Sequence, residues 1–202
     1  MKKIQSTGLY ILSKYGKEAG TIELNKLFYL VDVASYRLFG KSISNTKYIR
    51  AEKGPYSRAI SEQLFLLDGK QIKRTKKPSK GYSSFPKIAW TAIEETQTEP
   101  ELDSVEKELI NQVLQKIKGL APKDLEKLSY QTEPMLDILE KESKSKCDTL
   151  QEPLDFSKIK RDEYMQEFLD NYQKPLSEEE KKQKEYYDRE WKQVEVVLQA
   201  LE

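Results

Sequence analysis

The segment at residues 21–40, TIELNKLFYLVDVASYRLFG, constrains the fold of this chain more than any other. Its apolar residues recur at steps of three and four, which is the period of one face of an α-helix. They are Leu24, Leu27, Phe28, Val31, Ala34 and Leu38. The hydroxyl of Thr21 is expected to cap the start of this helix, and Gly40 suits a left-handed end. Because a face this wide has to be buried against other elements, the segment predicts a mainly helical core.

The rest of the chain predicts further helices around a small β-structure. Helices are expected over 4–15, between Pro55 and Gly69, from Asp103 to Gly119, from Pro122, from Thr132, near 155–173 and near 177–201. Strands are expected over 47–52, 70–75 and 86–93, with the last two paired as a hairpin. Asp103 and Glu106 have the spacing of a capping box. The helix that they open is expected to bury Val105, Leu109, Val113 and Ile117.

These elements predict an α+β fold that is mainly α, with a small antiparallel β-hairpin or sheet. Residues 142–152 are polar and aperiodic, which is typical of a linker. We therefore expect one domain over 1–145 and a helical C-terminal extension over 146–202.

The amino-acid composition excludes most of the common classes of catalytic site. The sequence contains no histidine and a single cysteine, Cys147, which lies in a polar, lysine-rich stretch and is interpreted as an incidental thiol. Without an imidazole there is no Ser-His-Asp triad, no Cys-His dyad and no histidine-ligated metal, and one thiol forms no intrachain disulfide. We therefore expect no catalysis, no cofactor and no metal site. An enzyme that uses only carboxylates and Mg²⁺ is the remaining catalytic alternative.

Charge is divided unevenly along the chain. Residues 1–98 hold 18 Lys and Arg against 8 Asp and Glu, whereas residues 99–202 hold 17 against 26. The two halves can pair with each other, or one of them can face an oppositely charged partner. Every apolar run is shorter than the ~18 residues of a membrane span, so we expect a cytoplasmic protein without membrane contact.

Three segments, in this order, resemble the SocA-like antitoxin family, also called the Panacea domain. They are TIELNKLFYLVDVASYRLFGKSI, YIRAEKGPYSRAISEQL and SVEKELINQVLQKIKGLAPKDLEKLSYQTEP. The family has a T-x-x-L-x-K-L-x-Y-x-x-D helix, a strand that runs into a Gly-Pro turn, and a late Leu-Ser motif near a proline. The matching positions are Thr21, Leu24, Lys26, Leu27, Tyr29, Asp32, Gly54, Pro55, Leu128, Ser129 and Pro134. The resemblance covers about residues 4–140.

The resemblance implies an antitoxin that neutralises a cognate toxin, usually encoded beside it, by direct protein–protein binding. Members pair with toxins of unrelated kinds and also occur in phages, prophages and mobile elements without a proven toxin. A protein of phage defence or of mobile elements that acts without a toxin partner therefore stays an alternative, as does a homo-oligomer. Tyr56 stands where the family often has valine, and Met135 where it often has tryptophan. These departures are expected to alter the choice of partner more readily than the fold.

The turn Lys53-Gly54-Pro55-Tyr56 is the first candidate binding site. Gly54 and Pro55 can have a purely structural role at a corner between a strand and a helix, because glycine supplies a positive φ and proline a preset φ. Loops held by rigid elements also carry binding residues. In that case Lys53 and Tyr56 are the side chains expected to touch the partner.

The second candidate is a basic segment without acidic residues between Asp68 and Glu94. Its basic residues are Lys70, Lys73, Arg74, Lys76, Lys77, Lys80 and Lys87, with Tyr82 and Phe85 between them. On a hairpin, they can protect a sheet edge, bind an acidic protein or contact nucleic acid, with Lys73, Arg74, Lys76, Lys77 and Tyr82 as the contact residues. A DNA-binding regulator is thus an alternative function, although the preceding helix is a poor recognition helix.

The third candidate is the last expected helix. Its apolar residues follow one another at steps of four and three: Tyr187, Trp191, Val194, Leu198 and Leu201. This stripe can dock on its own domain, and otherwise Tyr187 and Trp191 can hold a toxin or a second subunit. Lys26 and Asp32 lie close to the apolar stripe of the helix at 21–40 and are expected to make structural polar contacts.

Overall fold

The computed structural model describes residues 2–78, 86–93, 101–145 and 149–161. The chain divides into two units, Met1–Asp162 and Glu163–Glu202, and the described residues all belong to the first. The expected domain boundary at residue 145 falls inside this unit. The helix expected over 177–201, with Tyr187 and Trp191, lies outside the described residues. None of the described helices is long and apolar enough to cross a membrane.

The described part of the chain is an α+β domain that is mainly α, which confirms the predicted fold class. The helices are α1 (Lys3–Tyr15), α2 (Thr21–Phe39), α3 (Arg58–Phe65), α4 (Ser104–Lys116), α5 (Pro122–Tyr130) and α6 (Glu133–Ser145). The strands are β1 (Ala19–Gly20), β2 (Ile49–Ala51), β3 (Gly54–Tyr56), β4 (Ile72–Lys77) and β5 (Lys87–Ala92), followed by a 3₁₀ turn, η1 (Phe156–Lys158). The strands form two antiparallel sheets, β1-β5-β4 and β2-β3.

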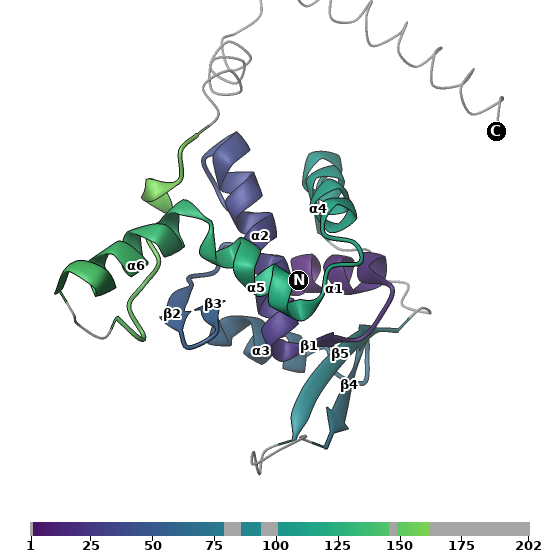
Figure 1. Cartoon of the computed structure of the whole chain (residues 1–202). Coiled ribbons are helices and arrows are strands. Elements are labelled where there is room, and N and C mark those ends of the chain that lie inside the picture. Colours follow the sequence, from purple (N-terminus) through teal and green to yellow (C-terminus); the bar gives the residue numbers. More distant parts are fainter. Residues whose placement is uncertain (1, 79–85, 94–100, 146–148, 162–202) are drawn as a thin grey trace, which may run out of the picture. The chain divides into compact units, whose positions relative to one another are not determined.

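The core is built around α2, as its apolar stripe predicts. Leu24, Leu27, Phe28 and Val31 are buried, and Gly40 ends the helix in the left-handed conformation. In Figure 1, α2 runs through the middle of the domain, with α4 on one side and α6 and the β2–β3 hairpin on the other. It contacts α1, α4, α5 and β3. The central helix therefore positions the elements that build the site described below.

The expected hairpin of the basic segment is formed by β4 and β5. Arg74 pairs with Trp90 in register, and β1 pairs with the other edge of β5. The Trp90 side chain is buried, and its Nε1 donates to the hydroxyl of Thr21 at 3.3 Å. That hydroxyl donates in turn to the carbonyl of Ile88 at 3.3 Å. The start of α2 is thus tied to the sheet.

Two expectations about the starts of helices are wrong. Thr21 does not cap α2: it is the first helical residue, and its hydroxyl is bound to the sheet. The Glu23 carboxylate instead accepts from the backbone N–H of the N-cap, Gly20, at 3.3 Å. Pro55 does not open the third helix: it lies in β3, and α3 begins at Arg58.

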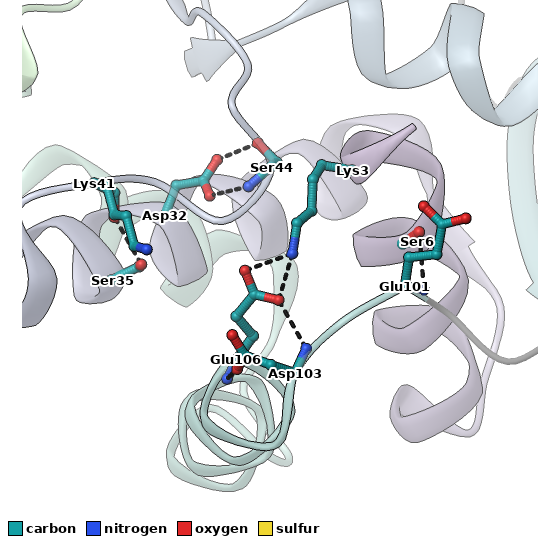
Figure 2. Close-up of polar contacts among 9 residues, drawn as sticks. All are labelled: Lys3, Ser6, Asp32, Ser35, Lys41, Ser44, Glu101, Asp103 and Glu106. Carbon is teal, nitrogen blue, oxygen red and sulfur yellow. Dashed lines mark hydrogen bonds and ion pairs between the residues drawn. The ribbon is translucent and has the colours of Figure 1, made fainter. Parts of the chain in front are cut away.

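The capping box of α4 is confirmed, whereas one residue of its predicted apolar face is not buried. Asp103 accepts from the Glu106 N–H at 2.7 Å, and Glu106 accepts from the Asp103 N–H at 3.0 Å. Figure 2 shows that Glu106 also meets Lys3 of α1, at 2.6 Å. Val105 was expected inside but is 55% exposed, because α4 packs on α1 and α2 through later turns, where Ile110 is buried.

Candidate functional site

The expected Gly-Pro turn lies in the hairpin of β2 and β3. Ala51 is opposite Gly54 across the two strands, and Lys53 is exposed at the tip between them. Gly54 has a φ of +86°, a left-handed conformation that glycine adopts without a steric penalty. Gly54 and Pro55 are buried. The turn is therefore embedded in the domain on one side and open to a partner at its tip.

The outer edge of β2 is paired with a segment from beyond α6. The Arg50 N–H donates to the Glu152 carbonyl, and the Gln151 N–H donates to the Arg50 carbonyl, both at 2.8 Å. The Leu154 N–H donates to the Tyr48 carbonyl at 2.9 Å. These residues belong to the part of the chain that was expected to be linker and extension. In the structure they pair with the hairpin like a third strand.

Two neighbouring residues of α2 form hydrogen bonds with backbone groups along the free edge of β3. Pro55 has no N–H, and its carbonyl accepts from Lys26 Nζ at 2.9 Å. The Ser57 N–H donates to Asn25 Oδ1 at 2.7 Å. These two contacts take the place of a neighbouring strand at the free edge of β3, so Asn25 and Lys26 of α2 hold the Gly-Pro turn in place. The expectation of a structural polar contact for Lys26 is confirmed.

Lys26 is a buried cation with few partners. The residue is 2% exposed, and the Pro55 carbonyl is the one hydrogen-bond acceptor of its ammonium among the described residues. Burial lowers the pKa of Lys26 from 10.5 to about 8; the carboxylate of Glu126 opposes this shift and the guanidinium of Arg50 adds to it. An ammonium carries three donors, and the described residues accept from one of them.

We expect the charge of Lys26 to reduce stability near neutral pH. Between about pH 8 and 10.5 the unfolded chain binds more protons than the folded chain, because the pKa of Lys26 is lower when folded. The free energy of unfolding should therefore rise by up to about 2 kcal/mol from about pH 7.5 to 9.5, relative to that of a Lys26→Met variant. Urea denaturation of both proteins measures the difference, with Lys116→Met on exposed α4 as the control. If the free energy of unfolding of the wild type, relative to that of Lys26→Met, stays constant or falls as the pH rises, the lowered pKa of Lys26 is contradicted.

Helices α5 and α6 hold the hairpin from the other side. A Cβ on Gly54 would lie 2.9 Å from Tyr130 Cε2 and 3.3 Å from Ser129 Oγ, so the strand packs directly on α5. The Arg50 guanidinium lies over the Tyr130 ring, 5.5 Å from its centroid, and donates to its hydroxyl at 3.3 Å. Arg50 also pairs with Glu142 of α6 at 3.1 Å. Ser129 of the late Leu-Ser pair therefore lies beside Gly54 of the turn.

Asp32 organises a second buried polar cluster behind the hairpin. Its carboxylate accepts from the Ser44 N–H at 2.9 Å, from the Ser44 hydroxyl, and from the Tyr48 hydroxyl at 2.7 Å. Figure 2 shows both of its oxygens directed at Ser44. Burial raises the pKa of Asp32, and these hydrogen bonds oppose the rise. Tyr48 stacks on Phe156, and its ring also meets Tyr29 edge-on. As expected, Asp32 is a structural residue.

Two surface pockets adjoin at the turn and share Ile22, Lys26 and Lys53. The first, about 480 Å³, lies toward β5 and the start of α5 and includes Lys87 and Lys123. The second, about 420 Å³, lies along β3 and the segment paired with β2, and includes Tyr56 and Leu150. Ile22 and Leu150 are 46% and 39% exposed. We call the two pockets together the turn groove.

The basic β4–β5 hairpin is partly neutralised by acidic residues around it. Arg74 pairs with Asp68 at 3.1 Å and covers the ring of Phe65 at 4.5 Å, and Lys77 pairs with Glu18. Lys73 and Lys76 are exposed, and no carboxylate of a described residue lies within ion-pair distance of either. Tyr82 lies outside the described residues. Two of the four predicted basic contact residues thus have internal partners.

The structure brings the four residues of the predicted turn into one place and adds residues that the sequence did not single out. Lys53 and Tyr56 line the turn groove, whose other walls come from α2, α5, β5 and the segment at 149–154. The sequence could have pointed to Ile22, because it is an isoleucine outside the apolar stripe of its helix. Nothing in the sequence distinguishes Leu150 as a groove residue. Among the described residues, no group of three or more cysteine, aspartate or glutamate side chains could hold a metal ion.

Comparison with known proteins identifies one family. A family model described as antitoxin SocA-like, Panacea domain, matches residues 24–134, which is more than half of the chain. The match runs from α2 through the β2–β3 hairpin to the first turn of α6, and so contains most of the groove walls. Searches of curated proteins and of solved structures found no match.

Proposed function

The chain belongs to the SocA-like antitoxin family of Panacea domains, and on this premise we propose that it neutralises a toxin by binding directly to it. In this proposal the toxin is encoded by an adjacent gene, the two proteins meet in the cytoplasm, and no catalysis is involved. The family match over residues 24–134 is the observation that carries the proposal.

The turn groove is the surface that best supports direct binding. It combines exposed apolar side chains, Ile22 and Leu150, with the aromatic Tyr56 and the basic Lys53. An apolar centre with a polar rim and an aromatic side chain is the usual composition of a protein-binding site. The walls are held by backbone and side-chain hydrogen bonds, so they lose little conformational freedom on binding.

Co-expression tests the proposed function. The product of the neighbouring gene is expected to stop growth when expressed alone, and growth should be restored when this chain is expressed with it. The two purified proteins are expected to elute as one stoichiometric complex in size-exclusion chromatography. A neighbouring product that is harmless alone and forms no complex would reject the antitoxin function. It would favour a phage or mobile-element interaction protein without a toxin.

We expect the substitution Ile22→Asp to weaken toxin binding at least about tenfold, because it replaces an exposed apolar side chain that lines both pockets of the groove with a charged one. The fold should tolerate the change, since Ile22 is exposed and an acidic residue suits the first turn of a helix. Val105→Asp is the matched control: Val105 is 55% exposed and is also the second residue of its helix. If Val105→Asp loses toxin binding and Ile22→Asp keeps it, the interface lies on α4 and not at the turn groove. Titration calorimetry and growth rescue measure both variants.

A DNA-binding regulator is the second candidate function. Exposed Lys73 and Lys76 on β4 favour it, and the ion pairs of Arg74 and Lys77 weaken it, because paired charges release fewer counterions on binding. Promoter DNA that is retained by the wild type in a salt-dependent way, and not by a Lys73→Glu/Lys76→Glu variant, would support this function.

A further inference from the structure

The buried ammonium of Lys26 lies where the two pockets of the turn groove meet. Lys26 borders both pockets, and it has one hydrogen-bond acceptor, the Pro55 carbonyl, among the described residues. No carboxylate of a described residue is hydrogen-bonded to this ammonium, although the charge of Glu126 favours its protonated form. A buried cation that is not directly paired is costly for folding. This arrangement leaves donors ready for an acceptor that enters from outside.

The charges around the first pocket favour an anion. Lys53, Lys87 and Lys123 line it together with Lys26, against two carboxylates. One of these, Glu23, is already engaged, because it accepts from the Tyr15 hydroxyl at 2.5 Å and from the Gly20 N–H at 3.3 Å. The pocket therefore has an excess of positive charge that its own acidic residues do not cancel.

We propose that the turn groove binds an extended acidic segment of the partner protein, whose aspartate or glutamate carboxylate accepts hydrogen bonds from the Lys26 ammonium. This inference rests on the proposed function and specifies its recognition chemistry. Apolar side chains next to the acidic residue pack on Ile22 and Leu150, which are exposed at the two pockets. An extended chain fits two adjoining pockets because its side chains at alternate positions point to the same side.

Burial makes the recognition specific for charge. A carboxylate forms a short charge-assisted hydrogen bond with a desolvated ammonium and neutralises its charge. A carboxamide of the same shape can accept a hydrogen bond but leaves the charge of the ammonium unneutralised. Binding also keeps Lys26 protonated, so affinity should fall as pH rises through about 8 to 9. The charged groups that face Lys26 from other elements are Glu126 of α5 and Arg50 of β2, together with the pocket residues Glu52, Lys53, Lys87 and Lys123.

Peptide selection on the full-length protein tests the proposal. A phage-displayed library of random linear dodecapeptides is selected on the immobilised chain. The enriched peptides are expected to share one Asp or Glu flanked by apolar residues. The best of them is then synthesised with that residue as Glu and as Gln. Fluorescence anisotropy should show binding at least about tenfold weaker for the Gln peptide at about pH 7, and a smaller ratio at about pH 9.

The variant Lys26→Met should lose the preference for Glu over Gln, whereas Lys116→Met, an equally apolar replacement on the exposed surface of α4, should keep it. The comparison of the two peptides on the wild type holds even if Lys26→Met is poorly folded. A selection that enriches no peptide or none with a shared acidic residue, or equal binding of the Glu and Gln peptides, would overturn the proposal. Toxin neutralisation that persists in Lys26→Met with unchanged affinity would also overturn it and leave the antitoxin function intact.

Discussion

Replacing Asp32 by alanine is expected to lower the free energy of unfolding by about 3 kcal/mol or more. The substitution leaves three buried donors without an acceptor: the N–H and hydroxyl of Ser44 and the hydroxyl of Tyr48. An orphaned buried donor costs about 1–3 kcal/mol, and the removal of a desolvated carboxylate offsets a part of the sum. Urea denaturation followed by circular dichroism measures the loss.

Two further variants separate the hydrogen bonds of Asp32 from its volume. Asp32→Asn keeps the shape but turns one acceptor into a donor that faces other donors, so its loss should be comparable to that of alanine. In a double-mutant cycle, Tyr48→Phe should cost less in the Asp32→Ala background than in the wild type, because the orphaned hydroxyl is removed. A loss below about 1 kcal/mol for Asp32→Ala, or additive effects in the cycle, would contradict the structural role assigned to this residue.

Gly54→Ala is expected to lower the free energy of unfolding by about 3 kcal/mol and to abolish toxin binding, because two penalties coincide at this residue. The left-handed backbone, with φ of +86°, disfavours any Cβ. The added methyl would also lie 2.9 Å from Tyr130 Cε2 and 3.1 Å from Lys26 Nζ. Relief of the clash has to shift α5 or the hairpin, and either shift deforms the turn groove.

Gly69→Ala separates the two penalties. Gly69 has a φ of +74°, but a Cβ there would have no atom within 4 Å. This control should lose only about 1 kcal/mol, the cost of the backbone conformation alone, and should keep toxin binding. Thermal and urea denaturation of both variants give the difference, which is the packing cost at Gly54. Equal losses for the two variants would show that the contact of β3 with α5 is not tight.

Patterns that depend on neighbouring residues in the chain were predictable. The steps of three and four in α2 identify its buried face, because helix geometry alone brings those positions together. The spacing of Asp103 and Glu106 locates the start of α4, since a capping box involves only one turn. The prediction from local spacing was wrong for Val105. This residue fits the apolar period of α4, yet it is 55% exposed in the described part of the chain.

The candidate site was predictable only in part. The Gly-Pro turn was singled out for its backbone chemistry, and it does lie in the groove. Lys26 was expected to make a structural contact, but its burial beside two pockets depends on β3 and α5, which lie 29 and about 100 residues further along the chain. The segment at 149–154 has the composition of a linker, and it is ordered because its backbone pairs with β2. Hydrogen bonds between backbones leave no mark on composition.

The sequence by itself determined the helical core, the family, and the absence of imidazole chemistry, because each follows from residue types and short spacings. Only the packing of distant segments determined that Pro55 lies in a strand rather than starting a helix, and that its carbonyl accepts from a buried lysine. The groove exists because α2, α5, β5 and the 149–154 segment converge on one hairpin. The burial of Lys26 beside the two pockets results from that convergence, and no local pattern in the sequence encodes it.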